Sequence, residues 1–244
     1  MPKHVFFELS NLVRDRSVLD PAHQPLFKKM CDAIDVVVVS EATAAQMRSY
    51  IPQSSDASFF TLAQNGNEAL NKSGEVLWTE SFSAEQTAMI LKLIERMKKE
   101  IDATPTDPND LVSQRGSALS YCFIGLHENL DKKFAFDEKG ALTKRMLTSY
   151  AHEIVGLSTM GVHTSPAICG FEFTLRGKKR GDNMLRLVKY EAWRKDESLY
   201  VGKGEFAGTV DESVIGIIPS LSLEDVDATF AWIRSKEAPP SPAP

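Results

Sequence analysis

Short apolar runs alternate with amphipathic stretches over the first 65 residues of the chain. The runs at 4–9 and 35–40 predict buried strands, and the four consecutive valines of the second are typical of a strand covered on both faces of a parallel sheet. Helical spacing marks 21–34 and the stretch after Ser40, and 59–66 predicts a third strand. This strand–helix alternation predicts a doubly wound α/β core.

The pattern changes after a hairpin predicted around Ser73-Gly74. Residues 83–101 predict a long amphipathic helix, whose start at Ser83, with Gln86 three residues later, has the form of a capping box. Further elements are expected in the order strand 111–125, helix 143–155, strands 158–177, helix 178–190, strand 197–208 and helix 221–236. The middle of the chain therefore predicts a compact α+β insertion.

These patterns predict a Rossmann-like doubly wound parallel core formed by residues 1–82 and 170–236, with an inserted α+β cap at 83–169. The last residues, EAPPSPAP at 237–244, are rich in proline and predict a disordered tail.

Composition narrows the class of protein. Of the 244 residues, 43% are hydrophobic and 25% charged, which is typical of a globular protein with a real core. The net charge of −5 argues against a nucleic-acid binder, whose phosphate contacts need a basic surface. No apolar run approaches the ~20 residues of a membrane span, and no signal peptide is evident. We therefore expect a cytoplasmic protein without a membrane partner, and the three widely spaced cysteines are expected to be buried, reduced thiols.

The opening stretch HVFFELSNLV raises the question of chemistry. A buried strand ends there in Glu8, and the polar residues Ser10 and Asn11 follow. The carboxyl ends of parallel strands are where α/β enzymes place their reactive groups. The position is compatible with an active-site strand end, the remnant of one or an ordinary strand exit, and the comparison below favours the remnant.

Four stretches, VVVVSEATAAQMRSYIP, LAQNGNEALNKSGEVLW, LVSQRGSALSYCFIG and VGKGEFAGTVDESV, support a specific comparison. Their order and spacing resemble the haloacid dehalogenase superfamily, in the branch with a large α/β cap that contains eukaryotic-type phosphomannomutases and related sugar-phosphate phosphatases. The resemblance extends over about residues 4 to 236 and implies the same core and cap.

The resemblance also assigns roles to positions. The family's aspartyl nucleophile falls on Glu8, which is one methylene longer, and its acid/base aspartate falls on Ser10. Ser40 keeps the hydroxyl that holds phosphate oxygens, although it is equally suited to capping the next helix. Arg180 stands where the family has a phosphate-binding lysine, and Arg115 in the cap would contact substrate.

The family's Mg²⁺ site is the most altered part. Lys203 stands at the first metal-binding aspartate of the late loop, where it would hold phosphate rather than metal, and Asp211 matches only the last acid. We expect Glu8 to pair with Lys203 or Arg180, and no cofactor to be needed, with Mg²⁺ bound only if activity is retained.

The sequence therefore predicts a phosphatase- or phosphomannomutase-like protein that is catalytically impaired and has a basic cleft for a phosphorylated small molecule or another anion. Two alternatives stay open. The first is a slow or altered Mg²⁺-dependent phosphatase that uses Glu8, and the second is a non-catalytic scaffold for protein interactions. The oligomeric state is not specified by the sequence.

Overall fold

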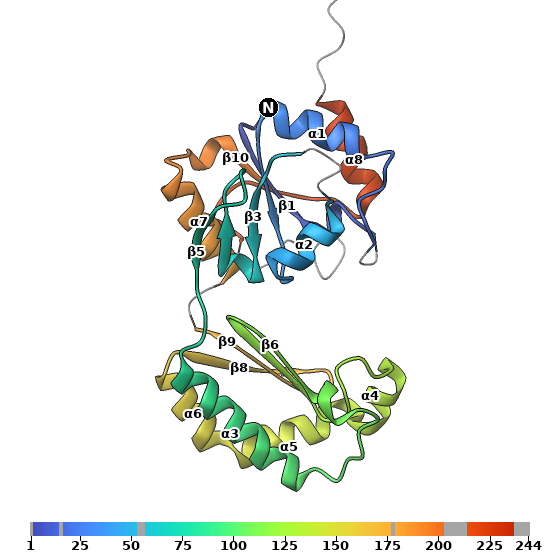
Figure 1. Ribbon diagram of the computed structural model, residues 1–244, viewed down its shortest axis with the longest axis vertical. Coiled ribbons are helices and arrows are strands. Elements are labelled where there is room, and N and C mark those ends of the chain that lie inside the picture. The colour runs from blue at the N-terminus through green and yellow to red at the C-terminus, as the bar shows by residue number, and fades with distance from the viewer. Residues whose placement is uncertain (1, 15–16, 53–56, 177–178, 203–213, 237–244) are drawn as a thin grey trace, which may run out of the picture. The chain divides into compact units, whose positions relative to one another are not determined.

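A computed structural model describes residues 2–14, 17–52, 57–176, 179–202 and 214–236 (Figure 1). Its contacts divide the chain into two compact units. The core unit contains Met1–Thr79 and Lys178–Pro244, and the inserted unit contains Glu80–Gly177. The tail predicted to be disordered, 237–244, lies outside the described residues.

The core unit is built on a seven-stranded sheet with the order β11-β10-β1-β2-β3-β4-β5. Strands β11, β10, β1, β2 and β3 are mutually parallel, whereas β4 and β5 form an antiparallel edge. The strands are β1 (His4–Glu8), β2 (Asp35–Val39), β3 (Phe60–Ala63), β4 (Glu68–Leu70), β5 (Val76–Thr79), β10 (Ser198–Gly202) and β11 (Ser220–Ser222). This is the predicted doubly wound α/β core.

Helices cover both faces of this sheet (Figure 1). They are α1 (Gln24–Ala33), α2 (Ala44–Tyr50), α7 (Arg180–Tyr190) and α8 (Val226–Ser235). Alternate residues of β1 point to opposite faces, so Val5 and Phe7 pack in the layer of α1, α2 and α8, while Phe6 packs in the layer of α7. The valines of β2 are fully buried between the two layers, as their run predicted.

The inserted unit has a four-stranded antiparallel sheet with the order β6-β7-β9-β8. Its strands are β6 (Val112–Arg115), β7 (Ala118–Cys122), β8 (Val162–Ala167) and β9 (Gly170–Leu175). Its helices are α3 (Ala84–Glu100), α4 (Leu130–Phe136), α5 (Ala141–Ser149) and α6 (Ala151–Thr159). The capping box predicted for α3 is confirmed, because Ser83 and Gln86 each accept a backbone N–H of the other.

Three predictions for the inserted unit were wrong. The strand expected at 111–125 is the β6–β7 hairpin, which reverses at Gly116, where φ is +46°. The single helix expected at 143–155 is two helices, α5 and α6, that meet at Tyr150, and α4 was not predicted. The boundary expected at 169/170 comes one strand too early, because β9 pairs with β7 and β8 and buries Phe171 and Phe173 in the inserted unit.

Within the described part of the chain, no helix combines the length and the apolar character needed to cross a bilayer.

Candidate functional site

Three strand ends of the core unit bring polar residues to one edge of the sheet. Glu8 ends β1 in register with Val39, so the next residue of β2, Ser40, lies at the same edge. The chain leaves β3 at Ala63 and enters a 3-10 turn at Gln64–Gly66. The backbone N–H of Asn65 donates to the carbonyl oxygen of Ser40 at 2.8 Å, which joins the ends of β2 and β3.

Arg180, the first residue of α7, lies at the centre of this cluster. Its Nη1 donates to Oε1 of Glu8 at 3.1 Å and to the hydroxyl of Tyr200 at 3.3 Å. That hydroxyl in turn donates to Oε2 of Glu8 at 3.4 Å. The Arg180 side chain is only 8% exposed and the Glu8 side chain 19%, so this ion pair is largely shielded from water. The ion pair expected for Glu8 is therefore found with Arg180.

Asn65 holds the other side of the guanidinium. Its Oδ1 accepts from Nε and Nη2 of Arg180 at 3.1 and 3.0 Å. Asn65 has left-handed backbone angles, φ 58° and ψ 30°, a conformation that asparagine adopts more readily than most residues. The amide of Asn183, one turn into α7, donates to the Asn65 carbonyl at 3.0 Å and to Asn67 Oδ1 at 3.2 Å. The turn and the helix therefore fix Arg180 from two directions.

The charges next to Arg180 bear on the predicted basic cleft. Among the described residues, Arg180 faces two carboxylates, since Glu41 Oε1 lies 3.9 Å from its Nη2 in addition to Glu8. Lys203 and Asp211, the other charged residues assigned to the site from sequence, lie outside the described residues.

The sequence predicts Mg²⁺ at this cluster only if activity is retained. Mg²⁺ needs several hard oxygen ligands, yet Glu8, the carboxylate at the end of β1, is already paired with Arg180. No group of three or more His, Cys, Asp or Glu suited to a metal ion occurs among the described residues. The described part of the site does not fit a Mg²⁺ ion.

The remaining predicted residues have simpler surroundings. Ser10, the acid/base position, is exposed in the 3-10 turn Leu9–Asn11. Its neighbour Asn11 is buried and donates to Leu223 and Thr229, so it ties this turn to the segment around α8. Ser40 Oγ accepts the backbone N–H of Ala42 at 3.1 Å.

The predicted residue Arg115 belongs to the inserted unit. Its Nη2 donates to Ser120 Oγ at 3.0 Å and to Glu172 Oε1 at 3.3 Å across three neighbouring strands. Leu119 and Tyr121 of the same sheet pack among the buried side chains that include those of α3, so Ser120 lies on the alternate face. Arg115 is thus held by a polar row on that face.

Sequence reasoning missed Asn65, Asn183 and Tyr200. The Asn65-Gly66 pair lies in LAQNGNEALNKSGEVLW, a stretch used for the family comparison, but no side-chain role is assigned to Asn65 there. Gly66 has a φ of +82°, and a Cβ there would lie 2.5 Å from Cβ of Asn183. Only glycine therefore lets α7 approach the turn this closely.

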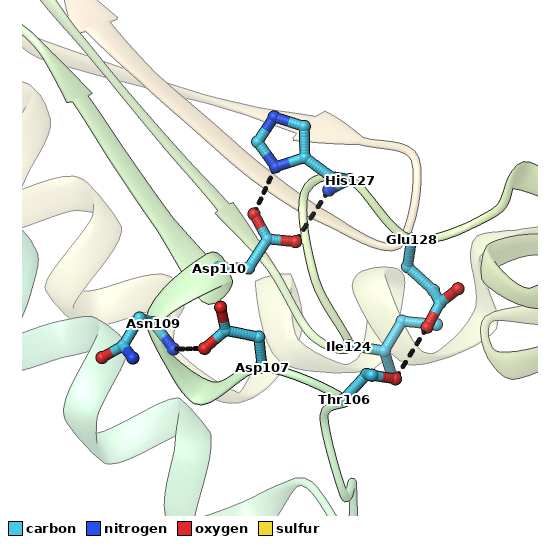
Figure 2. Close-up of a pocket in the computed structure, with 7 residues that line it drawn as sticks. All are labelled: Thr106, Asp107, Asn109, Asp110, Ile124, His127 and Glu128. Carbon is cyan, nitrogen blue, oxygen red and sulfur yellow. Dashed lines mark hydrogen bonds and ion pairs between the residues drawn. The ribbon is translucent and has the colours of Figure 1, made fainter.

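A pocket of about 440 Å³ lies elsewhere, in the inserted unit (Figure 2). Its polar contacts join the turn before β6 to the loop after β7. Asp110 accepts the backbone N–H of His127 at 2.8 Å and lies 2.5 Å from its Nδ1, and Thr106 donates to Glu128 at 3.0 Å. The lining residues are Thr106, Asp107, Asn109, Asp110, Ile124, His127 and Glu128.

The Asp110–His127 contact predicts a pH dependence. The backbone N–H of His127, followed by its side chain, lowers the pKa of Asp110. A carboxyl group whose folded pKa lies below its unfolded value, about 4, adds stability above that value and loses it as the pH falls through the folded pKa. We expect the carboxyl carbon of Asp110 to titrate below the ordinary range in an NMR pH series, and the His127 amide signal to move with it.

In Asp110→Asn the side chain keeps an acceptor but not the charge, so the His127 amide should lose this acid transition. A wild-type carboxyl group that titrates at or above the ordinary aspartate value would contradict the assignment.

The split core unit, its sheet order and the inserted α+β unit together define the fold of the haloacid dehalogenase-like hydrolases. Solved structures are similar over almost the whole chain. A haloacid dehalogenase-like hydrolase from Bacteroides thetaiotaomicron has a TM-score of 0.63 at 11% identity, covering 96% of this chain and 99% of that one. SMU.1108c from Streptococcus mutans gives 0.64 at 13% identity, covering 96% and 98%.

A third similar structure is the N-terminally truncated, IMP-bound IMP-nucleotidase of Plasmodium falciparum, with a TM-score of 0.61 at 12% identity, covering 96% of this chain and 68% of that one. No protein-family model matches the chain, and no curated protein matches it in sequence. The likeness therefore lies in the fold.

Proposed function

We propose that this chain is a phosphatase-like protein that has lost Mg²⁺-dependent phosphoryl transfer and binds a phosphorylated small molecule, or phosphate itself, at Arg180. The observation that carries the proposal is the largely buried ion pair between Arg180 and Glu8 at the end of β1. A carboxylate held by a guanidinium is a poor nucleophile and a poor metal ligand, because its charge is already neutralised.

A phosphate group is the natural competitor for this pair. Arginine presents a planar fork of donors that matches phosphate oxygens, and a doubly charged phosphate attracts it more strongly than a carboxylate does. Glu8 ends its strand and keeps 19% of its side chain exposed, so it can turn outward when a ligand takes its place. The similar solved structures support phosphate as the ligand group, since one is an IMP-nucleotidase and another belongs to the phosphatases of its superfamily.

The proposal makes Glu8 an internal competitor of the ligand. We therefore expect inorganic phosphate, titrated calorimetrically without Mg²⁺, to bind Glu8→Gln about tenfold more tightly than wild type. Glu41→Gln is the matched control. Its carboxylate lies 3.9 Å from Arg180 but is 72% exposed, so its removal should change the affinity much less.

Wild type and Glu8→Gln also test whether the protein catalyses Mg²⁺-dependent phosphate hydrolysis. Incubated with Mg²⁺ and p-nitrophenyl phosphate or hexose phosphates, wild type should show no turnover above a heat-inactivated sample. Mg²⁺-dependent turnover that disappears in Glu8→Gln would instead establish Glu8 as a catalytic group. If phosphate binds neither wild type nor Glu8→Gln, the anion-binding part of the proposal is wrong.

A further inference from the structure

Two of the three cysteines lie at the same end of the sheet in the inserted unit. Cys122 ends β7 and is paired with Gly170, the first residue of β9. Cys169 directly precedes Gly170, and its carbonyl accepts the N–H of Phe123 at 2.9 Å. This bond flanks the Cys122–Gly170 pair, which marks the closely spaced kind of antiparallel pair, with Cα atoms about 4.5 Å apart. Both cysteines are buried.

Two backbone features place the two cysteines next to each other. A Cβ at Gly170 would lie 2.0 Å from the carbonyl oxygen of Tyr121 and 2.9 Å from Cα of Cys122, so the two strands approach in a way that only glycine permits. Cys169 has a φ of 59°, a left-handed conformation that is uncommon for a residue with a side chain. The two cysteines therefore lie close enough across this strand pair for the Cys169 thiol to act on the pKa of Cys122.

The surroundings favour a thiolate at Cys122. The Cys169 thiol, and then the backbone N–H groups of Ile124 and Gly125, lower the pKa of Cys122 to about 6, against the opposing effect of burial. The neighbouring Cys122 sulfur, and then burial, raise the pKa of Cys169, which therefore keeps its proton. Burial raises the pKa of the third cysteine, Cys31 in the core unit, to about 12. Only Cys122 combines a thiolate with a thiol beside it.

We propose that Cys122 and Cys169 are a redox-active pair, which hydrogen peroxide converts to an intramolecular disulfide. The Cys122 sulfur attacks one peroxide oxygen, the O–O bond breaks, hydroxide leaves and a sulfenic acid forms. The Cys169 sulfur then attacks the Cys122 sulfur, the S–O bond breaks and water leaves with the Cys169 proton. Two sulfurs lose two electrons, and one peroxide becomes water and hydroxide. A dithiol returns both cysteines to the reduced form by exchange.

Oxidation also has a structural consequence. The backbone N–H groups of Ile124 and Gly125, which help to lower the pKa of Cys122, stand at the start of the loop that reaches His127. A disulfide sulfur carries no charge and is a much weaker acceptor, so oxidation removes the negative charge that these two N–H groups favour. Ile124 lines the pocket of the inserted unit (Figure 2). The redox state of the pair should therefore change the stability of the pocket wall.

The test uses the full chain with Cys31→Ala, so that Cys122 and Cys169 are its only cysteines. After treatment with hydrogen peroxide, denaturation and alkylation, the intact mass should show two thiols blocked to the reagent and two hydrogens lost. Peptide mapping should find Cys122 linked to Cys169, and dithiothreitol should restore both thiols. The rate should change little between pH 7 and 8 but fall towards pH 5, as the thiolate is protonated.

Two further variants of the Cys31→Ala protein distinguish the reactive sulfur of Cys122 from its partner, Cys169. Cys169→Ser should keep the reactive sulfur but lose its resolving partner, so a sulfenic acid should accumulate and be trapped by dimedone. Cys122→Ser should leave Cys169 unreactive at the same dose. Two alkylatable thiols after treatment of the parent, or linkage only between chains, would overturn the pair. Near-ultraviolet circular dichroism of each reduced variant checks that it is folded.

Hydrogen exchange tests the coupling to the pocket separately. The amides of Ile124 and Gly125 should exchange about tenfold faster or more in the disulfide form than in the reduced form. Equal protection in the two forms would show that the pair does not control this loop.

Discussion

Replacing Arg180 with methionine should lower the free energy of unfolding by about 3 kcal/mol, because breaking a buried ion pair leaves an uncompensated charge. Methionine fills much of the same volume but offers no donor to Glu8 or to Asn65 Oδ1. We place the effect at the lower end of the usual range because Glu8 retains 19% exposure and the hydroxyl contact with Tyr200. Denaturant unfolding of wild type and variant measures it.

The double variant Glu8→Gln/Arg180→Met shows whether the loss comes from the charge. With the carboxylate removed as well, most of the stability should return, because a neutral amide is far less costly to bury than a carboxylate. The coupling between the two substitutions is the quantity of interest. If the double variant is as unstable as the sum of the two single variants, Arg180 stabilises the protein through its contacts with Asn65 rather than through the ion pair.

Arg194→Met provides the matched control. Arg194 pairs with Asp196 at 2.6 Å, closer than Arg180 is to Glu8, but both side chains are more than two-thirds exposed. Exposed pairs are screened by water, so this substitution should leave the unfolding midpoint almost unchanged. Burial, rather than distance, should therefore separate the two arginines.

The fold of the core unit could be predicted from sequence because its signals are local. The DVVVVS run can be a strand only if both faces are covered, and β2 lies between two helical layers. The capping box at Ser83 similarly fixes the start of α3 within one residue. In both cases, the residues that carry the sequence pattern are the ones that form the strand or the helix start.

The inserted unit was harder to predict because its pattern is ambiguous. The alternation of apolar and polar residues through 111–125 continues across Gly116, so the glycine itself is the one sequence signal for the reversal. In the structure this glycine has a positive φ at the turn between β6 and β7. The sequence pattern assigned β9 to the core unit because Phe171 and Phe173 would suit the buried interior of either unit. The pairing of β9 with β7 places it in the inserted unit.

The site was predictable in part. The resemblance placed Glu8 and Arg180 at one edge, and opposite charges at such positions predict a pair, which the structure contains. Asn65 and Tyr200 could not be assigned, because their roles depend on where α7 begins relative to two strand ends. Their contacts with Arg180 join residues 115 and 20 positions apart in the chain, respectively.

Replacing Gly170 with alanine should be one of the most damaging single substitutions in the inserted unit. The added Cβ would lie 2.0 Å from a backbone carbonyl oxygen, that of Tyr121, and no side-chain rotation relieves such an overlap. The β7–β9 pair must separate, which weakens the packing of Phe171 and Tyr121 on α3. We expect a loss of about 3 kcal/mol or more, above the usual cost of overpacking.

Gly156→Ala is the matched control, since it adds the same methyl group to the same unit. Gly156 lies in α6, and a Cβ there would meet nothing within 4 Å. Alanine is the better helix former by about 1 kcal/mol, so this variant should be as stable as wild type or slightly more stable. Thermal unfolding of both proteins compares them directly.

The same pair of variants links stability to the cysteines. If Gly170 is what holds β7 and β9 close, Gly170→Ala should also slow the formation of the Cys122–Cys169 disulfide, whereas Gly156→Ala should leave its rate unchanged. A Gly170→Ala protein with wild-type stability and an unchanged rate of disulfide formation would show that the strands can separate without cost. The close approach at Gly170 would then not be the feature that brings the two thiols together.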